Sequence, residues 1–256
     1  AVAIYLCITM AFLSKQRLEL AHTWIQKKWD EHYWNFVTKY QNRIHWDIVS
    51  CNTNLTMDII DKNSHVNWRW NKISYNPNLN IEFIKKHLDK IWYWNEISRH
   101  PNITMEIIEN NSDLPWDWEW ISQNPNLTIE FIQKYLYKPL DWTWISRNSN
   151  ITMEIIENHP YLSWNWEYIS YNPNLTMEFI DKYINKPYTW DWDYISTNKN
   201  ITIEFIKKYS DMFWNWDEIS KHPNITMDMI VNNPDLPWKW ELISSNPNLT
   251  IDWIKR

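Results

Sequence analysis

The chain of 256 residues contains no glycine, although a chain of this length usually carries roughly 18, at about 7% usage. This absence excludes every device that needs a glycine backbone: the P-loop, the dinucleotide-binding turn, the nucleophile elbow and the glycine-rich kinase loop. It also excludes the glycine cap of helices and the common two-residue hairpin turns. Several usual enzyme architectures are therefore ruled out before any motif is sought.

Cysteine and positive charge are also scarce. Two Cys are too few for a disulfide framework, and they show no zinc-ligand spacing. The 25 Lys and Arg are outnumbered by 31 Asp and Glu, which gives a net charge of -6. A nucleic-acid-binding surface is normally basic. We therefore expect no metal, no cofactor and no nucleic-acid partner.

Against these absences stand 22 tryptophans, which recur within an internal repeat. The string Asn-Pro-Asn-Leu/Ile-Thr returns, with variations, every 24 residues, except for one step of 26 with its insertion near Tyr188-Thr189. Self-similarity at such a period is the signature of a repeat architecture. Nine repeats fit, the last of them partial: 44–67, 68–91, 92–115, 116–139, 140–163, 164–189, 190–213, 214–237 and 238–256.

Certain positions hardly vary between repeats, which indicates a shared structural role. One column is Trp46, Trp70, Trp94, Trp118, Trp142, Trp166, Trp192, Trp216 and Trp240. A second is Ser50, Ser74, Ser98, Ser122, Ser146, Ser170, Ser196, Ser220 and Ser244. A third is Asn54, Asn78, Asn102, Asn126, Asn150, Asn174, Asn200, Asn224 and Asn248. In most repeats a second Trp lies two residues before this one, as Trp116 does before Trp118. Because burial of Trp removes a large apolar area from water, we expect both Trp columns to form the core.

Each repeat contains two segments that read apolar, cap, apolar, acid, apolar, Ile. In the fourth repeat these segments are 116–121 and 127–132, and their caps are Asp117 and Thr128. Asp and Thr are good N-caps, and the acid that follows is favoured by the helix dipole. The pattern predicts a first helix of six or seven residues from Trp118 and a second helix over about 129–135. Arg69, Tyr93 and Lys239 replace the cap in other repeats and predict weaker starts.

Residues 1–43 precede the repeats. Apolar residues recur at three- and four-residue steps over 14–40, which predicts one amphipathic helix that caps the first repeat. Its apolar stripe is Leu18, Ala21, Ile25, Trp29, Tyr33, Phe36 and Tyr40. Residues 1–13 are apolar but too short to cross a bilayer, so we expect no membrane span. The sequence thus predicts an all-α protein, an α-solenoid of stacked helix-turn-helix repeats with an N-terminal capping helix.

Three recurring features could suggest sites, but each has a structural interpretation. The acidic column is expected to serve the helix dipole rather than to bind cations. All members of the Asn column except Asn78 form sequons for N-glycosylation, yet the column is better explained by Asx turns that lead into the Thr caps. The Ser column has no accompanying His or Lys, so we expect its hydroxyls to bond backbone carbonyls. No catalytic residue is predicted.

The informative surface should lie where the repeats differ. The position after the recurring Ser varies and often carries Tyr or Arg, which are typical interface anchors. This candidate partner-binding face is Tyr75, Arg99, Gln123, Arg147, Tyr171, Thr197 and Lys221. A weaker 48-residue alternation also separates Met-Glu-Ile-Ile repeats from Glu-Phe-Ile-x-Lys repeats. We expect alternate repeats to pack slightly differently.

The pattern Trp-x-Trp-x-x-Ile-Ser, followed by Asn-Pro-Asn-Ile/Leu-Thr-x-Glu-x-Ile, covers about residues 44–256. It resembles the tryptophan- and asparagine-rich repeat proteins of mimivirus-like giant DNA viruses. Family members often have Trp after the Thr, where this chain has Met or Ile. The resemblance implies a viral origin and a location in the host cytoplasm, with the virion or secretion as alternatives, but it implies no activity.

Enzyme is the least supported class of function for this sequence. The leading hypothesis is a non-enzymatic repeat scaffold for protein–protein interaction, whose protein partner the sequence does not identify. One alternative is a structural component of virion type that self-associates. The other is a secreted surface protein that bears glycans or binds carbohydrate.

Overall fold

The computed structural model describes residues 20, 23–25, 27–29, 31–185 and 190–254, and no strand occurs among them. The predicted all-α repeat class is confirmed. The first helices of the repeats are α2 (Trp46–Ser50), α4 (Trp70–Ile73), α6 (Trp94–Ser98), α8 (Trp118–Ile121), α10 (Trp142–Arg147), α12 (Trp166–Ile169), α14 (Trp192–Ile195), α16 (Trp216–Ser220) and α18 (Trp240–Ile243). The second helices are α3 (Met57–Lys62), α5 (Ile81–Lys86), α7 (Met105–Asn110), α9 (Ile129–Lys134), α11 (Met153–Asn158), α13 (Met177–Tyr183), α15 (Ile203–Lys208), α17 (Met227–Asn232) and α19 (Ile251–Ile254).

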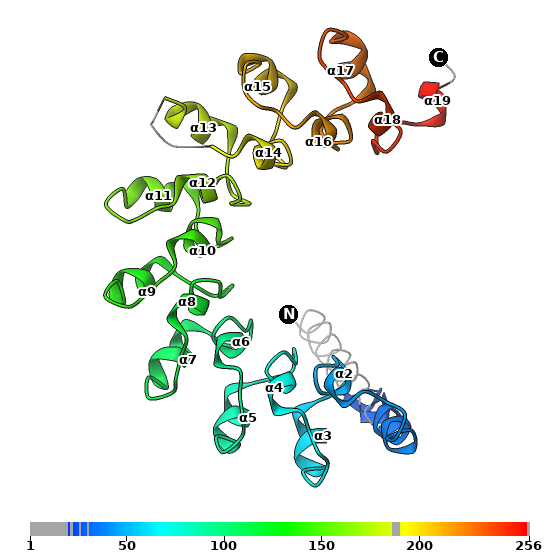
Figure 1. Cartoon of the computed structure of the whole chain (residues 1–256), viewed down its shortest axis with the longest axis vertical. Coiled ribbons are helices and arrows are strands. Elements are labelled where there is room, and N and C mark those ends of the chain that lie inside the picture. Colours follow the sequence, from blue (N-terminus) through cyan, green and yellow to red (C-terminus); the bar gives the residue numbers. More distant parts are fainter. Residues whose placement is uncertain (1–19, 21–22, 26, 30, 186–189, 255–256) are drawn as a thin grey trace, which may run out of the picture. The chain divides into compact units, whose positions relative to one another are not determined.

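The chain forms two compact parts, which are considered separately here. The first part comprises Ala1–Ile103 and Asn110–Trp116, and the second comprises Thr104–Glu109 and Asp117–Arg256. Within each part, first helices of consecutive repeats are neighbours: α2 contacts α4, α10 contacts α12, and α16 contacts α18. In the second part, the first helices lie along one edge and the second helices along the other (Figure 1).

Side-chain caps set the starts of the helices. The Thr128 hydroxyl accepts a hydrogen bond from the Phe131 N–H at 3.3 Å, and the Asp117 carboxylate accepts one from the Trp120 N–H at 3.2 Å. At Arg69, Tyr93 and Lys239 no side-chain cap forms. The predicted pattern of strong and weak caps is therefore confirmed.

Most first helices end sooner than the sequence predicts: α8 has only four residues, whereas α10 has six. After Ile121 the backbone bonds tighten: the Gln123 N–H donates to the Trp120 carbonyl at 3.0 Å, and the Asn124 N–H donates to the Ile121 carbonyl at 2.9 Å. These i→i−3 bonds are of the 3₁₀ type and end the α pattern. Throughout the described residues no backbone φ is positive, so the turns do not need the conformation that glycine usually supplies.

The two Trp columns have different environments, which the sequence did not distinguish. Trp116, at the residue before the cap, is 7% exposed, and its indole N–H donates to the Asn111 carbonyl at 2.8 Å. The nearly invariant column, by contrast, is half-buried, and its last member, Trp240, is 66% exposed. The expectation that both columns form the core is therefore wrong for the column at the first helical position, which runs from Trp46 to Trp240. The fully buried interior is instead aliphatic, as at Ile121 and Ile132.

The half-buried Trp column links consecutive repeats through ring edges. Trp142 meets Trp164 with centroids 5.4 Å apart and planes at 89°, and Trp216 meets Trp238 at 5.2 Å and 90°. Edge-to-face pairs of this kind stabilise beyond the area that they bury. The column therefore acts between repeats, which explains why it recurs although it is partly exposed.

The Asn-Pro-Asn turn ties each repeat to the one before it. Asn172 is 1% exposed, and its side-chain amide donates to the carbonyls of Ser146 at 2.9 Å, Asn148 at 3.1 Å and Ile151 at 2.9 Å. Its Oδ1 accepts the Asn174 N–H at 2.8 Å. The predicted Asx turn is thus present, but the first Asn of the motif makes it and not the second.

Histidine replaces this first Asn in two repeats and reproduces its bonds. The His100 Nδ1 accepts the Asn102 N–H at 3.1 Å, and Nε2 lies 3.0 Å from the Asn76 carbonyl oxygen. Because Nδ1 must accept, the ring is neutral with its proton on Nε2. Burial lowers the pKa of His100 and also that of His222, which is the equivalent residue in a later repeat.

The recurring Ser also spans two repeats. The Ser196 hydroxyl donates to the Trp192 carbonyl at 2.7 Å, as the sequence predicts. The same oxygen accepts the Asn215 N–H of the next repeat at 2.9 Å, which the sequence does not reveal. This second bond satisfies a backbone donor at the start of the next first helix.

The 48-residue alternation has a physical basis in the second helices. The Lys of a Phe-Ile-x-Lys repeat pairs with an acid of the preceding second helix, as Lys134 does with Glu109 at 2.8 Å and Lys182 with Glu157 at 3.0 Å. The Phe of such a repeat stacks on its own Trp, as between Phe131 and Trp118 at 6.0 Å. Repeats therefore differ in which side of the pair they supply, and the repeat 164–189 supplies both, through Lys182 and Asp181.

The N-terminal helical segment over 31–39 packs on the first repeat by its last turns. Val37 is 2% exposed, and the Trp34 ring lies 5.5 Å from that of Trp68. The predicted stripe is wrong in part, because Ile25, Trp29 and Phe36 are largely exposed. A groove of about 960 Å³ separates residues 23–34 from α3, so only the end of the segment covers the repeat.

Several predictions fall outside the described residues. These are the stripe residues Leu18 and Ala21, the apolar segment 1–13, the insertion at Tyr188-Thr189, and Arg256.

Removing the Asn172 amide should destabilise the second part. Asn172→Ala leaves three backbone carbonyls of the preceding repeat without their donor, so we expect a loss of about 2–3 kcal/mol, measured by chemical unfolding followed by circular dichroism. Asn158→Ala, at an exposed position at the end of α11, is the matched control and should change stability by less than about 0.5 kcal/mol. Equal effects of the two substitutions would contradict the role of the Asn172 amide in holding consecutive repeats together.

Acid should weaken the protein through His100 and His222. Their pKa is lowered on folding, so their contribution to stability is fully present above about pH 6.5 and is lost as the pH falls below it. The double variant H100N/H222N restores the residue of the other repeats and should lose less Tm between about pH 7.5 and about pH 5 than the wild type. The exposed His65→Asn serves as control and should behave like the wild type.

Candidate functional site

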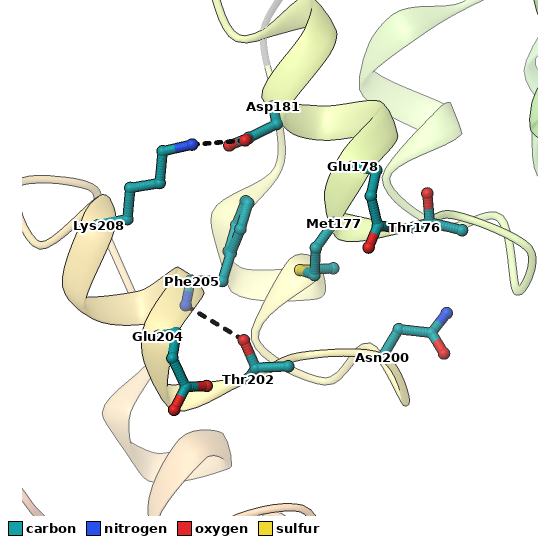
Figure 2. A pocket seen from close by; sticks show the side chains of 9 residues that line it. All are labelled: Thr176, Met177, Glu178, Asp181, Asn200, Thr202, Glu204, Phe205 and Lys208. Carbon is teal, nitrogen blue, oxygen red and sulfur yellow. Dashed lines mark hydrogen bonds and ion pairs between the residues drawn. The ribbon is translucent and has the colours of Figure 1, made fainter.

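A cleft of about 430 Å³ lies between α13 and α15 in the second part. Figure 2 shows Asp181 of α13 and Lys208 of α15 paired at one end of it. Thr202 also lines the cleft, and its hydroxyl is occupied as the cap of α15, accepting the Phe205 N–H at 3.2 Å. The polar groups of the cleft thus serve the packing of two repeats.

The pKa values of Asp181, Lys208 and Tyr209 in this cleft are shifted in the directions that stabilise their usual protonation states. Hydrogen bonds from Lys208 and Tyr209 lower the pKa of Asp181, and the bond to Asp181 raises the pKa of Lys208. Burial, together with the Asp181 carboxylate, raises the pKa of Tyr209. A general base needs a raised carboxylate pKa, and a nucleophilic lysine needs a lowered one. Both shifts at this site run in the opposite sense.

The acidic column lies where the helix dipole favours it, as Glu178 and Glu204 do in the first turns of α13 and α15. Among the described residues, no group of three or more His, Cys, Asp or Glu side chains is placed to hold a metal ion. In the same portion of the chain, no helix combines the length and the apolarity needed to cross a membrane.

The sequon Asn side chains are occupied by the fold. The Asn174 amide nitrogen donates to the Ser149 carbonyl at 2.7 Å and to the Ile151 carbonyl at 3.1 Å. An N-linked glycan would replace one of the two hydrogens on this nitrogen. Glycosylation and the stacking of repeats therefore compete for the same group.

The structure places the seven candidate residues of the partner-binding face at the ends of the first helices, with Tyr75 and Thr197 exposed and the others half-buried. Two of the cations pair within their own repeats: Arg99 with Glu96 at 2.6 Å and Lys221 with Glu218 at 2.9 Å. Gln123 is half-buried. The Thr197 hydroxyl donates to the Tyr194 carbonyl at 2.8 Å.

Two of the seven, Arg147 and Tyr171, come together in the second part. The Arg147 guanidinium lies 5.6 Å from the Tyr171 ring centroid and 4.5 Å from that of Trp144. The Tyr171 ring in turn stacks on Tyr194 of the next repeat at 3.9 Å and on Tyr168 at 5.3 Å. We refer to Trp144, Arg147, Tyr168, Tyr171, Asp191 and Tyr194 as the Tyr171 cluster.

A single carboxylate holds the centre of this cluster. The Tyr171 hydroxyl donates to Asp191 Oδ2 at 2.5 Å, while Asp191 Oδ1 accepts the Tyr194 N–H at 3.0 Å and caps α14. The hydrogen bond to Asp191, followed by burial, raises the pKa of Tyr171 to about 12. The phenol is therefore a fixed, neutral element of the surface at physiological pH.

Only Arg147 and Tyr171 of the six cluster residues belong to the face predicted from the sequence. Trp144, Tyr168 and Tyr194 occupy the position two residues before the recurring Ser, and Trp120 fills it in the preceding repeat. This position is polar or aliphatic in the remaining repeats, and is aromatic only in these four consecutive ones. That local run of aromatics at a variable position is the signal that could have identified the site.

A smaller group of the same kind occurs in the first part. Tyr75 meets Tyr93 edge-on at 6.2 Å, and the Lys72 ammonium lies 5.6 Å from the Tyr75 ring centroid. The Asn71 amide donates to the Tyr93 hydroxyl at 3.0 Å. Ring contacts between neighbouring first helices therefore occur in both parts, but the second part has the longer run.

The Tyr171 phenol should titrate abnormally late. We expect its ¹³Cζ resonance, assigned by its loss in Tyr171→Phe, to remain that of a neutral phenol at about pH 11, where ordinary tyrosines near pKa 10 are ionised. Asp191→Asn keeps an oxygen to cap α14 but removes the negative charge, so the Tyr171 pKa should fall toward 10. Titration of Tyr171 near pH 10 in the wild type would contradict the bond.

No family model, curated protein or solved structure matches the chain. The function of the Tyr171 cluster must therefore be argued from its own geometry. The resemblance of the repeat to the giant-virus proteins stays an expectation from the sequence.

Proposed function

We propose that the protein is a non-enzymatic repeat scaffold that binds a protein partner through the face of its first helices in the second part. The observation that carries this proposal is the Tyr171 cluster, in which aromatic rings and an Arg from three consecutive repeats form one partly exposed surface. Tyr, Trp and Arg are the residues that most often dominate binding energy at protein interfaces.

The distribution of variation along the repeat supports the proposal. The turn Asn, the recurring Ser and the Ile of the core are occupied by stacking and hardly change between repeats. Apart from the buried Glu96, the residues of the two variable columns are partly or fully exposed at the first helices. Repeat proteins bind partners by such variation on a constant frame.

The chemistry of the polar groups supports a non-enzymatic role. The Ser196 hydroxyl both donates to and accepts from the backbone, so it is engaged as a structural group. Asp181 and Lys208 have pKa shifts that oppose catalysis. These three groups are therefore engaged in contacts that hold repeats together.

Affinity capture with a surface variant tests the proposal. The double variant Arg147→Ser/Tyr194→Ser should lose protein partners that the immobilised wild type retains from a lysate of its native cells, by at least about fivefold in quantitative mass spectrometry. Both side chains are partly exposed, so the variant should keep the helical circular dichroism of the wild type.

The control variant carries two changes away from the first helices, Tyr137→Ser and Tyr161→Ser, at residues that are 75% and 67% exposed. It should retain the partners. Recovery of only further copies of this chain would contradict the proposal and favour a self-assembling structural component.

A further inference from the structure

We infer that the partner contacts this face with arginine side chains on an extended basic segment. This inference rests on the proposed function and names the chemistry of its partner. It is drawn from the Tyr171 cluster together with the acidic residues beside it.

The cluster already holds one guanidinium. Arg147 lies between the rings of Trp144 and Tyr171, at 4.5 and 5.6 Å from their centroids. These distances are within the range of cation–π attraction. Arg147 thus demonstrates, inside the chain, the geometry in which this surface holds a planar cation between aromatic rings of successive repeats.

The next repeat offers aromatic surface without a cation of its own. The position equivalent to Arg147 is Tyr171 in one repeat and Thr197 in the following one. Tyr194, which is 42% exposed, presents its ring there and stacks on Tyr171 by one side. A guanidinium from a partner would find here the kind of ring that Arg147 uses one repeat earlier.

Apart from Arg147, the charged side chains beside the rings are acidic. Glu167 and Asp193 occupy the helical position before Tyr168 and Tyr194 and are exposed. Asp191 adds a carboxylate that also binds the Tyr171 hydroxyl. An acidic rim repels phosphate, so it disfavours nucleic acid and complements a basic polypeptide.

Arginine fits this surface better than lysine does. Its planar guanidinium stacks on aromatic faces and donates in a fork to carboxylates, whereas the lysine ammonium is a strongly hydrated point charge. On α14, a ring at Tyr194 and a carboxylate at Asp193 follow one another in the chain. Because consecutive helical side chains do not face each other, one arginine of the segment can stack on Tyr194 while another pairs with Asp193.

The test uses short fluorescein-labelled peptides and fluorescence anisotropy with the full chain. A peptide of alternating Arg and Ser should bind, its Lys counterpart should bind several-fold more weakly, and its Glu counterpart should not bind. The double variant Asp193→Asn/Tyr194→Ala should weaken the Arg peptide about tenfold, because it removes one ring and one charge.

The matched control is Asp211→Asn/Tyr137→Ala, which changes the same residue types and the same net charge at exposed positions outside the first helices. It should leave the affinity for the Arg peptide unchanged. Equal weakening by both variants would show general attraction to an acidic protein, and would overturn the inference, as would equal binding of the Arg and Lys peptides. If the capture experiment recovers a partner that depends on Arg147 and Tyr194 while the Arg peptide does not bind, the inference fails and the proposed function stands.

Discussion

Stacking in this protein depends on a side-chain amide that donates to backbone carbonyls of the preceding repeat, as Asn172 does to three of them. Helices of four to seven residues are far below the length that is stable alone in water. Each repeat must therefore be stabilised by contacts with its neighbour. A buried amide with both hydrogens satisfied supplies this link with a fixed geometry, because an unpaired buried carbonyl is costly. His100 shows that another residue type can provide the same link: its Nδ1 accepts the Asn102 N–H, and its Nε2 lies at the Asn76 carbonyl oxygen of the preceding repeat.

The same requirement explains why the polar columns do not form sites. Ser196 and Asn174 belong to columns that could have been read as nucleophiles or glycan acceptors, and both are engaged between repeats. A side chain that completes the backbone of a neighbour is not available for chemistry on a substrate. The variable positions of the first helices are among those that escape this constraint. The Tyr171 cluster lies there, which is why the proposed function and the inferred arginine contact both concern the face of these helices.

Tryptophans at two positions of the repeat, two residues apart, have different structural roles. Trp116, before the cap, is buried and bonds the Asn111 carbonyl. Trp190 is the one described Trp of its column whose indole N–H lacks an acceptor, and the repeat just before it is the one with two extra residues. The Trp at the first helical position packs edge-on against the next repeat, which tolerates partial exposure.

The sequence by itself determined the repeat, the two helices, their caps and the all-α class, because these follow from local spacing and from residues that act within one turn. The absence of glycine belongs with them, since polar turns with negative φ suffice. Tertiary structure alone decided which Trp column is buried, which Asn makes the Asx turn, and how far the N-terminal helix is covered. It also decided that Arg147, Tyr171 and Tyr194 form one surface. Contacts between side chains 23 to 26 residues apart depend on how one repeat lies on the next, and a periodic pattern within each repeat does not specify that placement.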